Sequence, residues 1–457
     1  MAVSSSRQAA LEALLDRQGN VTVHLDRLLA AGNLPPAEAA LASELAHGVV
    51  RRRRTLDAII RAYSTRPGRE PPPAIREILR LGVYQLVFLD RIPVFAAVNE
   101  SVGLCRRRHA RQAGYVNALL RAVSGGMGEP REGPAPLEAR VAALEPRRYR
   151  RFERDVCADP QADPAAFLAD YVSLPDDLAG RWLREARNLD DAVARAMQVN
   201  ARPPIVARVD RSRTTVEAVL ADLAAAGAEA VAHANGRSIV FTAHVDLAAL
   251  DAFRRGLITP QDPTATAALD ALGLQGGRRV LDLCAAPGTK TIQAAEAMER
   301  TGRIVAVDVS EAKLQRIAEA ARRCGADLVE TCPAERVGSL LPESFDAVIV
   351  DAPCSNTGVL ARRIEARWRF RADQMGRLAA DQRRLLEMAS LFCAPGGSIL
   401  YSTCSIEPEE NDRVVQAFCR AHPRHRVVDQ RLTRPQGFVE PQRFHDGGFW
   451  AVVAKDY

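Results

Sequence analysis

The sequence predicts a multidomain protein with an all-α N-terminal bundle, a small α+β module and a C-terminal doubly wound α/β domain. Three observations predict this order. Apolar residues recur at helical spacing up to about residue 124, short strand-like runs begin after residue 202, and strand-like and helical segments alternate after residue 259. Because 457 residues exceed one ordinary core, we expect domains at 1–135, 136–258 and 259–457.

The N-terminal segment has the pattern of several amphipathic helices. Leu41, Leu45 and Val49 recur at four-residue spacing. A second apolar stripe comprises Ile75, Ile78, Leu79, Gly82 and Leu86. Residues 124–136 are dense in glycine and proline and form the first predicted linker, after which 138–199 again shows a helical pattern.

The pattern changes at 203–209, a run with the composition of a strand. A helical stretch at 215–226 follows, and then two further strand candidates at 229–232 and 238–242. This order predicts a small α+β (RRM-like) module.

From residue 259 onward, strand-like and helical segments alternate. The strand-like runs are 279–283, 303–307, 347–350 and 398–401. The helical stretches are 290–298, 311–323, 372–391 and 409–421. This alternation predicts a parallel sheet covered by helices on both faces, which is a Rossmann-like domain.

Composition indicates a globular protein of a reducing compartment. Hydrophobic residues make up 47% and charged residues 26%, and no apolar stretch reaches the roughly 20 residues that a membrane-spanning helix needs. The N-terminus lacks the apolar core of a secretion signal, so we expect a cytoplasmic protein. We also expect a monomer with no membrane partner. The nine cysteines include no Cys-x-x-Cys pair, so we expect neither disulfides nor a zinc site, and no other metal.

The formal charge of +6 favours an anionic partner only weakly, because 56 acidic residues offset 62 basic ones. Arginine runs occur at 51–54, 106–111 and 147–152, the last with aromatic residues that could stack on bases. A single basic run is more often a solvated helix face. The three together favour a nucleic-acid contact more than any one does.

Two cysteines directly follow predicted strands. Cys354 lies in an Asp-Ala-Pro-Cys sequence after 347–350, and Cys404 lies in Ser-Thr-Cys-Ser after 398–401. Ligands in open α/β sheets bind outside the carboxyl ends of the strands, so both thiols should lie at one sheet edge beside the ligand. Free cysteines are usually buried small hydrophobic residues, but a pair in this position suggests covalent catalysis.

The segment 280–291 runs from a strand through a turn of small residues into a helix, which is the setting for a nucleotide-like ligand. Asp308 follows the next strand, roughly 20 residues after Gly288, where an acidic side chain can reach ribose hydroxyls. The alternative is that Gly288 only makes a tight turn and Asp308 only caps a helix. Lys290 favours a ligand, since the chain uses arginine almost everywhere else.

Three segments in order, 281–291, 351–355 and 401–411, resemble the RNA cytosine-5 methyltransferases. Other segments resemble a NusB-type RNA-binding domain, namely 44–49, 79–86, 91–93, 96–100 and 114–121. The combination resembles the ribosomal RNA small-subunit methyltransferase B family over nearly the whole chain. We therefore expect the N-terminal bundle to be NusB-like.

The resemblance implies S-adenosylmethionine as methyl donor and a cytosine of 16S ribosomal RNA as acceptor. It assigns nucleophilic attack to Cys404 and product release to Cys354, with Asp351 where cofactor and base meet. The cofactor-binding residues that it implies are Cys284, Ala285, Ala286, Pro287, Gly288, Thr289, Lys290, Asp308 and Asp351. Two thiols suit this chemistry, because cytosine C5 is a weak nucleophile until a thiolate adds to C6. Attack by Cys354 is the alternative.

The chain departs from the family pattern in several places. Between Val329 and Val337, where the family commonly carries an acidic residue that contacts the adenosine, this chain has no Asp, so Glu330, Glu335 or the backbone alone would replace it. The segment 362–369 lacks the usual His-Pro-Asp, and 261–264 and 445–450 also vary. Two alternatives therefore stay open: a transfer-RNA cytosine-C5 methyltransferase, and a non-catalytic RNA-binding or ribosome-assembly factor.

Overall fold

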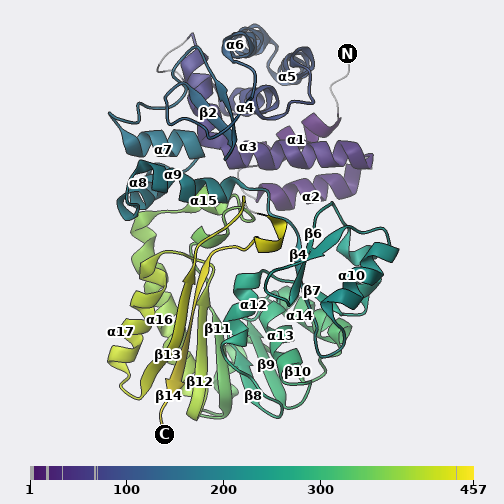
Figure 1. The fold of residues 1–457 in the computed structure, drawn as a ribbon, viewed down its shortest axis with the longest axis vertical. Coiled ribbons are helices and arrows are strands. Elements are labelled where there is room, and N and C mark those ends of the chain that lie inside the picture. Colours follow the sequence, from purple (N-terminus) through teal and green to yellow (C-terminus); the bar gives the residue numbers. More distant parts are fainter. Residues whose placement is uncertain (1–4, 17–19, 33, 66–67, 69, 439) are drawn as a thin grey trace. The chain divides into compact units, whose positions relative to one another are not determined.

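The computed structural model describes residues 5–16, 20–32, 34–65, 68, 70–438 and 440–457. The chain forms two compact units. The first extends to Ala201 and includes Arg363–Ala372, and the second comprises Arg202–Arg362 and Asp373–Tyr457. The short helix α15 (Ala366–Arg369), labelled in Figure 1, therefore belongs to the first unit although it comes late in the sequence.

The first unit is mainly helical. Its other helices are α1 Ser5–Leu15, α2 Val21–Gly32, α3 Pro36–Tyr63, α4 Pro73–Phe88, α5 Val94–His109, α6 Ala113–Gly126, α7 Pro164–Val172, α8 Asp176–Glu185 and α9 Leu189–Met197. Pro36 and Pro73 begin α3 and α4, where the missing backbone N–H costs nothing. Leu45, Val49 and Ile75 of the predicted apolar stripes are fully buried. The predicted N-terminal bundle is confirmed.

A small antiparallel sheet interrupts this unit, and the helical prediction over 138–199 is wrong there. Its strands are β1 Arg131–Glu132, β2 Val141–Glu145 and β3 Arg148–Arg151. The first four residues of β2 are all buried, so the strand lacks the alternation that would distinguish it from a helix. Arg52 of α3 also donates hydrogen bonds to the carbonyl oxygens of Ala143 and Leu144. Residues 136–201 thus lie in the helical unit, apart from the α+β module.

Two of the three arginine runs are largely engaged within the unit. In the first run, Arg54 pairs with Asp170 at 2.6 Å, and in the third, Arg150 pairs with Asp90 at 2.8 Å. Arginines of the second run, 106–111, are exposed around the end of α5. Much of the basic sequence therefore stabilises the fold.

The second unit is built on a seven-stranded sheet. Its strands are β8 Arg279–Asp282, β9 Arg303–Asp308, β10 Val329–Pro333, β11 Phe345–Asp351, β12 Cys393–Thr403, β13 His425–Thr433 and β14 Gly448–Lys455. Their order is β10-β9-β8-β11-β12-β14-β13, and β14 runs antiparallel to both its neighbours. The strand order reverses between β8 and β11, which is where open α/β sheets bind ligands. The four predicted strands are present, whereas β10, β13 and β14 are not among the predicted strand-like runs.

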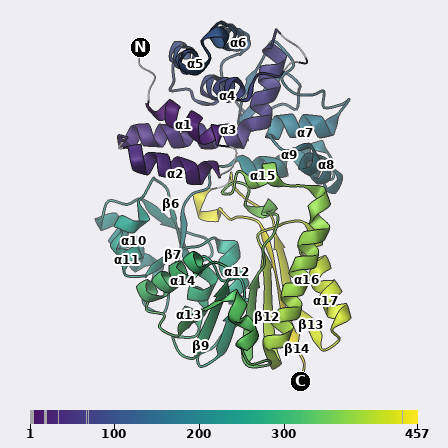
Figure 2. The same cartoon turned by 180° about the vertical axis from the view of Figure 1, so that it is seen from behind.

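Helices cover both faces of this sheet (Figures 1 and 2). One face carries α12 Pro263–Asp270, α13 Thr289–Ala297 and α14 Glu311–Cys324, and the other carries α16 Met375–Phe392 and α17 Asp412–Ala421. Val348 and Val350 contribute to the core under α16 and α17, while Ile349 contributes to the opposite core. Burial on both faces explains the continuous apolar run that predicted β11.

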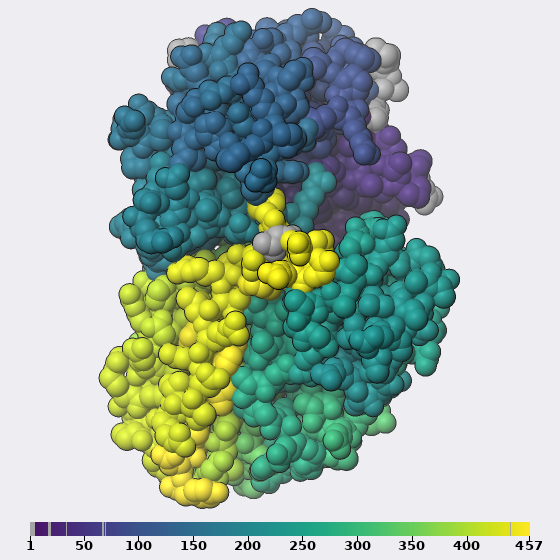
Figure 3. Space-filling view, viewed as in Figure 1, coloured from purple at the N-terminus to yellow at the C-terminus, as the bar shows by residue number. Residues whose placement is uncertain are grey.

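The predicted α+β module forms a four-stranded antiparallel sheet. Its elements are β4 Val206–Val209, α10 Val216–Ala225, β5 Ala230–Ala232, β6 Ser238–Phe241, α11 Asp251–Arg254 and β7 Ile258–Pro260. The short helix η8 (Pro441–Arg443) lies against it, and the backbone N–H of Ala234 donates to the carbonyl of Gln442 at 2.8 Å. Figure 3 shows this yellow C-terminal segment beside the teal module.

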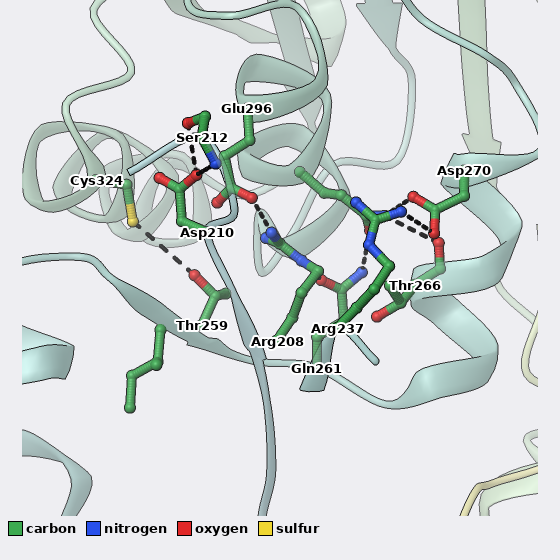
Figure 4. A network of polar contacts seen from close by, with 12 residues as sticks. Arg208, Asp210, Ser212, Arg237, Thr259, Gln261, Thr266, Asp270, Glu296 and Cys324 are labelled. Carbon is green, nitrogen blue, oxygen red and sulfur yellow. Dashed lines mark hydrogen bonds and ion pairs between the residues drawn. The ribbon is translucent and has the colours of Figure 1, made fainter. Parts of the chain in front are cut away.

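A buried polar network joins the module to α13 (Figure 4). Arg208 of β4 forms an ion pair with Glu296 of α13, and its Nε donates to Gln261 at 2.7 Å. The Arg208 side chain is 1% exposed, and burial lowers its pKa to about 10. Because Lys290 lies in the first turn of α13, the network also holds the helix that carries a predicted site residue.

Among the described residues, no helix is both long enough and apolar enough to cross a bilayer.

Candidate active site

The two predicted thiols lie side by side at the carboxyl ends of β11 and β12. These strands are parallel neighbours, and their register pairs Asp351 with Ser402. Cys354 and Cys404 follow within three residues of those positions, and their Sγ atoms are 3.3 Å apart. Both side chains are partly exposed. One base could therefore meet both sulfur atoms.

The environment favours the protonated form of Cys354. The hydrogen bond with Cys404, burial and the charge of Cys404 together raise the pKa of Cys354 well above its ordinary value. Cys354 can then donate its proton to Cys404, whose own Sγ lies 3.2 Å from Oδ1 of Asn356. Asn356 is held in turn, because its Nδ2 donates to the Cys354 carbonyl at 2.8 Å.

Lys290 and Asp351 form an ion pair beside the thiols, with Nζ 2.8 Å from Oδ2. Burial would lower the pKa of Lys290, but the charge and hydrogen bond of Asp351, together with the charge of Cys404, raise it overall. Ser402 fixes the carboxylate by donating to Asp351 Oδ1 at 2.8 Å. The site therefore holds a charged ammonium close enough to interact with Cys404.

A fully buried carboxylate links the two thiol-bearing loops, and sequence reasoning missed it. Glu410 accepts hydrogen bonds from the backbone N–H and the hydroxyl of Ser355, the residue after Cys354. It also accepts from the hydroxyl of Ser405, the residue after Cys404, at 2.6 Å. Glu410 thus holds both loops in one arrangement. A Glu-Glu pair in the sequence gave no sign of which side chain points inward.

The loop 284–290 leads from β8 into α13, as predicted. Gly288 has a φ of +100°, a left-handed conformation that favours glycine. Asp308 at the end of β9 accepts hydrogen bonds from the backbone N–H groups of Ala286 and Ser310 at 3.3 and 3.2 Å. Val309 beside it is 84% exposed, which is unusual for a large apolar residue.

These residues fit S-adenosylmethionine. The small-residue loop lets a ligand approach the backbone, the Asp308 carboxylate suits ribose hydroxyls, and the exposed Val309 offers an apolar surface for adenine. Asp282 of β8 adds a further polar group that sequence reasoning missed: its Oδ1 is buried without a hydrogen-bond partner, and burial raises its pKa to about 7. Cys284 does not offer a third nucleophile, because burial raises its pKa to about 12.

Three of the four variant segments fall in two places in the second unit. Glu330 pairs with Arg303 at 2.8 Å, near the amino ends of the strands and away from the cofactor loop. Glu335 follows the carboxyl end of β10 and is exposed, so it is the better placed replacement for the missing Asp. The variant segments 261–264 and 445–450 meet, since the backbone N–H of Asp446 donates to Asp262 Oδ2 at 3.0 Å.

The variant C-terminal segment also supports the Cys404 loop. Gly447 donates its backbone N–H to the carbonyl of Gly358, and Gly358 donates to the carbonyl of Cys404 at 2.9 Å. A Cβ on Gly358 would lie 2.5 Å from the Gly447 carbonyl oxygen, so this approach requires glycine.

The chain is similar to known proteins over most of its length. Residues 269–446 match the family described as 16S rRNA methyltransferase RsmB/F, and residues 4–125 match the NusB family. Probable ribosomal RNA small subunit methyltransferase B of Bacillus subtilis (strain 168) is 30% identical, over 93% of this chain and 90% of the relative. Ribosomal RNA small subunit methyltransferase B of Vibrio cholerae is 31% identical, over 92% and 91%.

A solved structure of a methyltransferase homologue protein from Pyrococcus horikoshii is similar in fold. It is 26% identical with a TM-score of 0.51, and the match covers 62% of this chain and 95% of that one.

The seven-stranded sheet, its cofactor loop and the matched relatives define a methyltransferase with the S-adenosylmethionine-dependent fold and a NusB-type helical domain. Within that class, the chain belongs to the ribosomal RNA small subunit methyltransferase B family.

Proposed function

We propose that the protein methylates C5 of a cytosine in 16S ribosomal RNA through a covalent bond between Cys404 and C6 of the base. The observation that carries this proposal is the 3.3 Å separation of the Cys354 and Cys404 sulfur atoms at the carboxyl ends of adjacent strands. The relatives named as ribosomal RNA small subunit methyltransferases support the RNA substrate. Because ribosomal RNA is a cytoplasmic substrate, the protein should act in the cytoplasm.

Cys404 attacks as a thiolate. Its sulfur forms a bond to C6, and the electron pair of the C5–C6 double bond moves towards C5, which becomes nucleophilic. The Lys290 ammonium, held by Asp351, lies near enough to favour the negative sulfur. S-adenosylmethionine supplies an electrophilic methyl group when bound, held by the loop 284–290 and Asp308. Asp351 positions the reacting groups where the loop meets the thiols.

Cys354 releases the product. After methyl transfer, C5 carries both a methyl group and a proton. The C5–H electrons re-form the C5–C6 double bond, the C6–S bond breaks, and the departing sulfur of Cys404 takes the proton of Cys354. The C5 proton returns Cys354 to its thiol form. The raised pKa of Cys354 supports this role, because the thiol must hold its proton until the sulfur leaves.

The test uses 16S RNA from a strain lacking the gene, incubated with the protein and methyl-labelled S-adenosylmethionine. We expect label in the RNA and one bisulfite-resistant cytosine. Cys404→Ala should transfer nothing, whereas Cys419→Ala, which changes a free thiol on α17, should behave as the unaltered protein. Absence of label in any RNA would contradict the proposal.

The labelling assay and a titration with the methyl donor separate two other functions. Label in transfer RNA with none in 16S RNA identifies a transfer-RNA enzyme. An RNA-binding assembly factor needs no methyl donor, so failure to bind S-adenosylmethionine in a calorimetric titration would favour it.

A further inference from the structure

The helical unit contains a hollow that plays no part in the chemistry proposed above. Its volume is about 620 Å³, within the roughly 300–1,000 Å³ of ordinary ligand sites. It is lined by the end of α1, the starts of α2 and α4, Arg53 of α3, and three residues of the Arg363–Ala372 segment. Those three residues are Glu365, Trp368 and Arg369.

The lining carboxylates already have partners. The contacts are Asp16 to His24 at 2.8 Å, Glu77 to Arg80 at 2.5 Å, and Glu365 to the backbone N–H of Thr22 at 3.2 Å. Two of the lining arginines lack such partners. Among the residues that the structure describes, Arg53 has neither an ion-pair partner nor a hydrogen-bond acceptor, and the exposed Arg369 has none either. Arg53 and Arg369 therefore line the hollow as two guanidinium groups that no carboxylate contacts directly.

Arg53 is the stronger indication of an anionic ligand, because its side chain is only partly exposed. Burial and the neighbouring charge of Arg80 lower the pKa of Arg53, and the charges of Glu77, Asp57 and Glu365 offset only part of this. A guanidinium in such surroundings costs free energy unless an anion neutralises it. Its one contact of note is with Trp368, whose ring centroid lies 5.2 Å from the guanidinium carbon. An anionic ligand would supply the missing partner.

Trp368 provides a fixed aromatic surface at the same place. Its Nε1 donates a hydrogen bond to the carbonyl of Val50 at 2.8 Å, which sets the orientation of the indole. The preceding residue, Arg367, is fully buried and donates to the carbonyls of Arg51 and Val199. The segment is thus anchored, and a ligand would meet a preorganised ring.

The hollow thus brings together an aromatic ring and two guanidinium groups without direct carboxylate contacts. A ring of this kind stacks on a nucleic-acid base, and guanidinium groups bind a phosphate. These features match the base and the phosphate of a nucleotide.

We propose that this hollow binds one unpaired nucleotide of the RNA substrate, with the phosphate on Arg53 and Arg369 and the base on Trp368. The proposal rests on the proposed function, because that function makes RNA the partner. A free mononucleotide has the same chemistry, but an RNA strand adds contacts outside the hollow and binds more tightly.

Binding of a labelled single-stranded RNA 20-mer of mixed sequence tests the proposal by fluorescence anisotropy. Arg53→Gln and Arg369→Gln should each raise Kd about tenfold and reduce the slope of log Kd against log salt by about 0.7. Trp368→Leu should raise Kd about tenfold without changing the slope, because stacking is not electrostatic. Arg27→Gln removes an exposed charge from α2 outside the hollow and should change Kd less than twofold. Guanosine monophosphate should compete only weakly.

Two further readouts guard against misfolded variants. Arg53→Gln should shift the melting temperature by only a few degrees, because Arg53 makes no direct ion pair, so binding measured well below that temperature compares folded proteins. RNA should also quench tryptophan fluorescence. This quenching should vanish in Trp368→Phe, because the other two tryptophans, Trp182 and Trp450, are 7% and 5% exposed.

The results separate this proposal from the proposed function. If the variants bind RNA as the unaltered protein does, or if RNA does not quench Trp368, the nucleotide site is wrong even where methylation succeeds. If no RNA is methylated but the variants lose binding as expected, the site stands and the reaction is wrong. Where both hold, the variants should raise KM for RNA and leave kcat unchanged.

Discussion

The carboxylate of Glu410 accepts two hydrogen bonds from Ser355, one from its backbone N–H at 2.9 Å and one from its hydroxyl. Ser355 follows Cys354 directly, and Ser405 makes the equivalent bond next to Cys404. The separation of the two thiols therefore depends on a residue that touches neither sulfur. Glu410 is a positioning residue.

Glu410→Gln should lower kcat at least tenfold with little change in KM for RNA or for the methyl donor. The amide keeps the size of the side chain but replaces one acceptor oxygen with a donor, so the two loops lose a shared anchor. Steady-state kinetics measure this split. Glu409→Gln, next to it and paired with Arg413, is the matched control and should keep kcat within twofold. An equal fall in both variants would contradict a special role for Glu410.

Cys354→Ala should trap a covalent protein–RNA adduct that survives denaturing electrophoresis. The bond from Cys404 to C6 still forms, but the proton that assists departure of the sulfur is missing. The double variant Cys354→Ala/Cys404→Ala should form no adduct. Full turnover by Cys354→Ala without an adduct would reverse the division of roles.

Arg208→Met should destabilise the protein by about 3–5 kcal/mol, because it leaves Glu296 buried without its cation. Replacing both residues with methionine should recover most of that loss. Urea unfolding followed by circular dichroism measures both effects. Arg303→Met breaks an ion pair whose side chains are more than half exposed and should cost less than about 1 kcal/mol. Equal losses from the buried and exposed pairs would contradict the argument.

The melting temperature should fall as pH rises from about 5 to 8, and Asp282 should account for part of this. Burial raises the pKa of Asp282 to about 7 in the folded protein, so the folded state binds a proton that the unfolded state has released in this range. Stability is therefore lost as the pH passes the folded-state pKa. Asp282→Asn should reduce the slope by a few degrees per pH unit, and Asp373→Asn, at an exposed position, should leave it unchanged. An unaltered slope in Asp282→Asn would refute the assignment.

Sequence patterns predicted four strands of the seven-stranded sheet, each from an apolar run. The strand β11 is buried on both faces, so its apolar run was recognisable. Its end was recognisable because the Asp-Ala-Pro-Cys sequence with Cys354 follows. The strands β10 and β13 are mostly exposed at the two edges of the sheet, and they lack an apolar pattern. Pairing with β9 and β14 forms them, and pairing partners are not visible in local sequence.

The part of the site that lies in recognisable sequence motifs could be predicted. The thiols, Lys290 and Asp351 come together because their motifs end adjacent strands or begin a helix beside them. Glu410 and Asn356 were missed because their roles depend on which way a side chain turns after a strand ends. The arginine run at 51–54 shows the same limit: its members divide between structural pairing and the hollow only once α3 has packed.

The polypeptide passes from one compact unit to the other at Ala201, returns after Arg362 and leaves again after Ala372. A chimaera could exchange only the N-terminal half with that of a relative. Arg367 would then face a relative's residues at the positions of its present acceptors, which are Arg51, Ser173, Val199 and Asn200. Recombination within this family therefore has to exchange the segment Arg363–Ala372 together with the helices that it contacts. Protein engineers who wish to graft a new targeting domain onto the catalytic half face the same requirement.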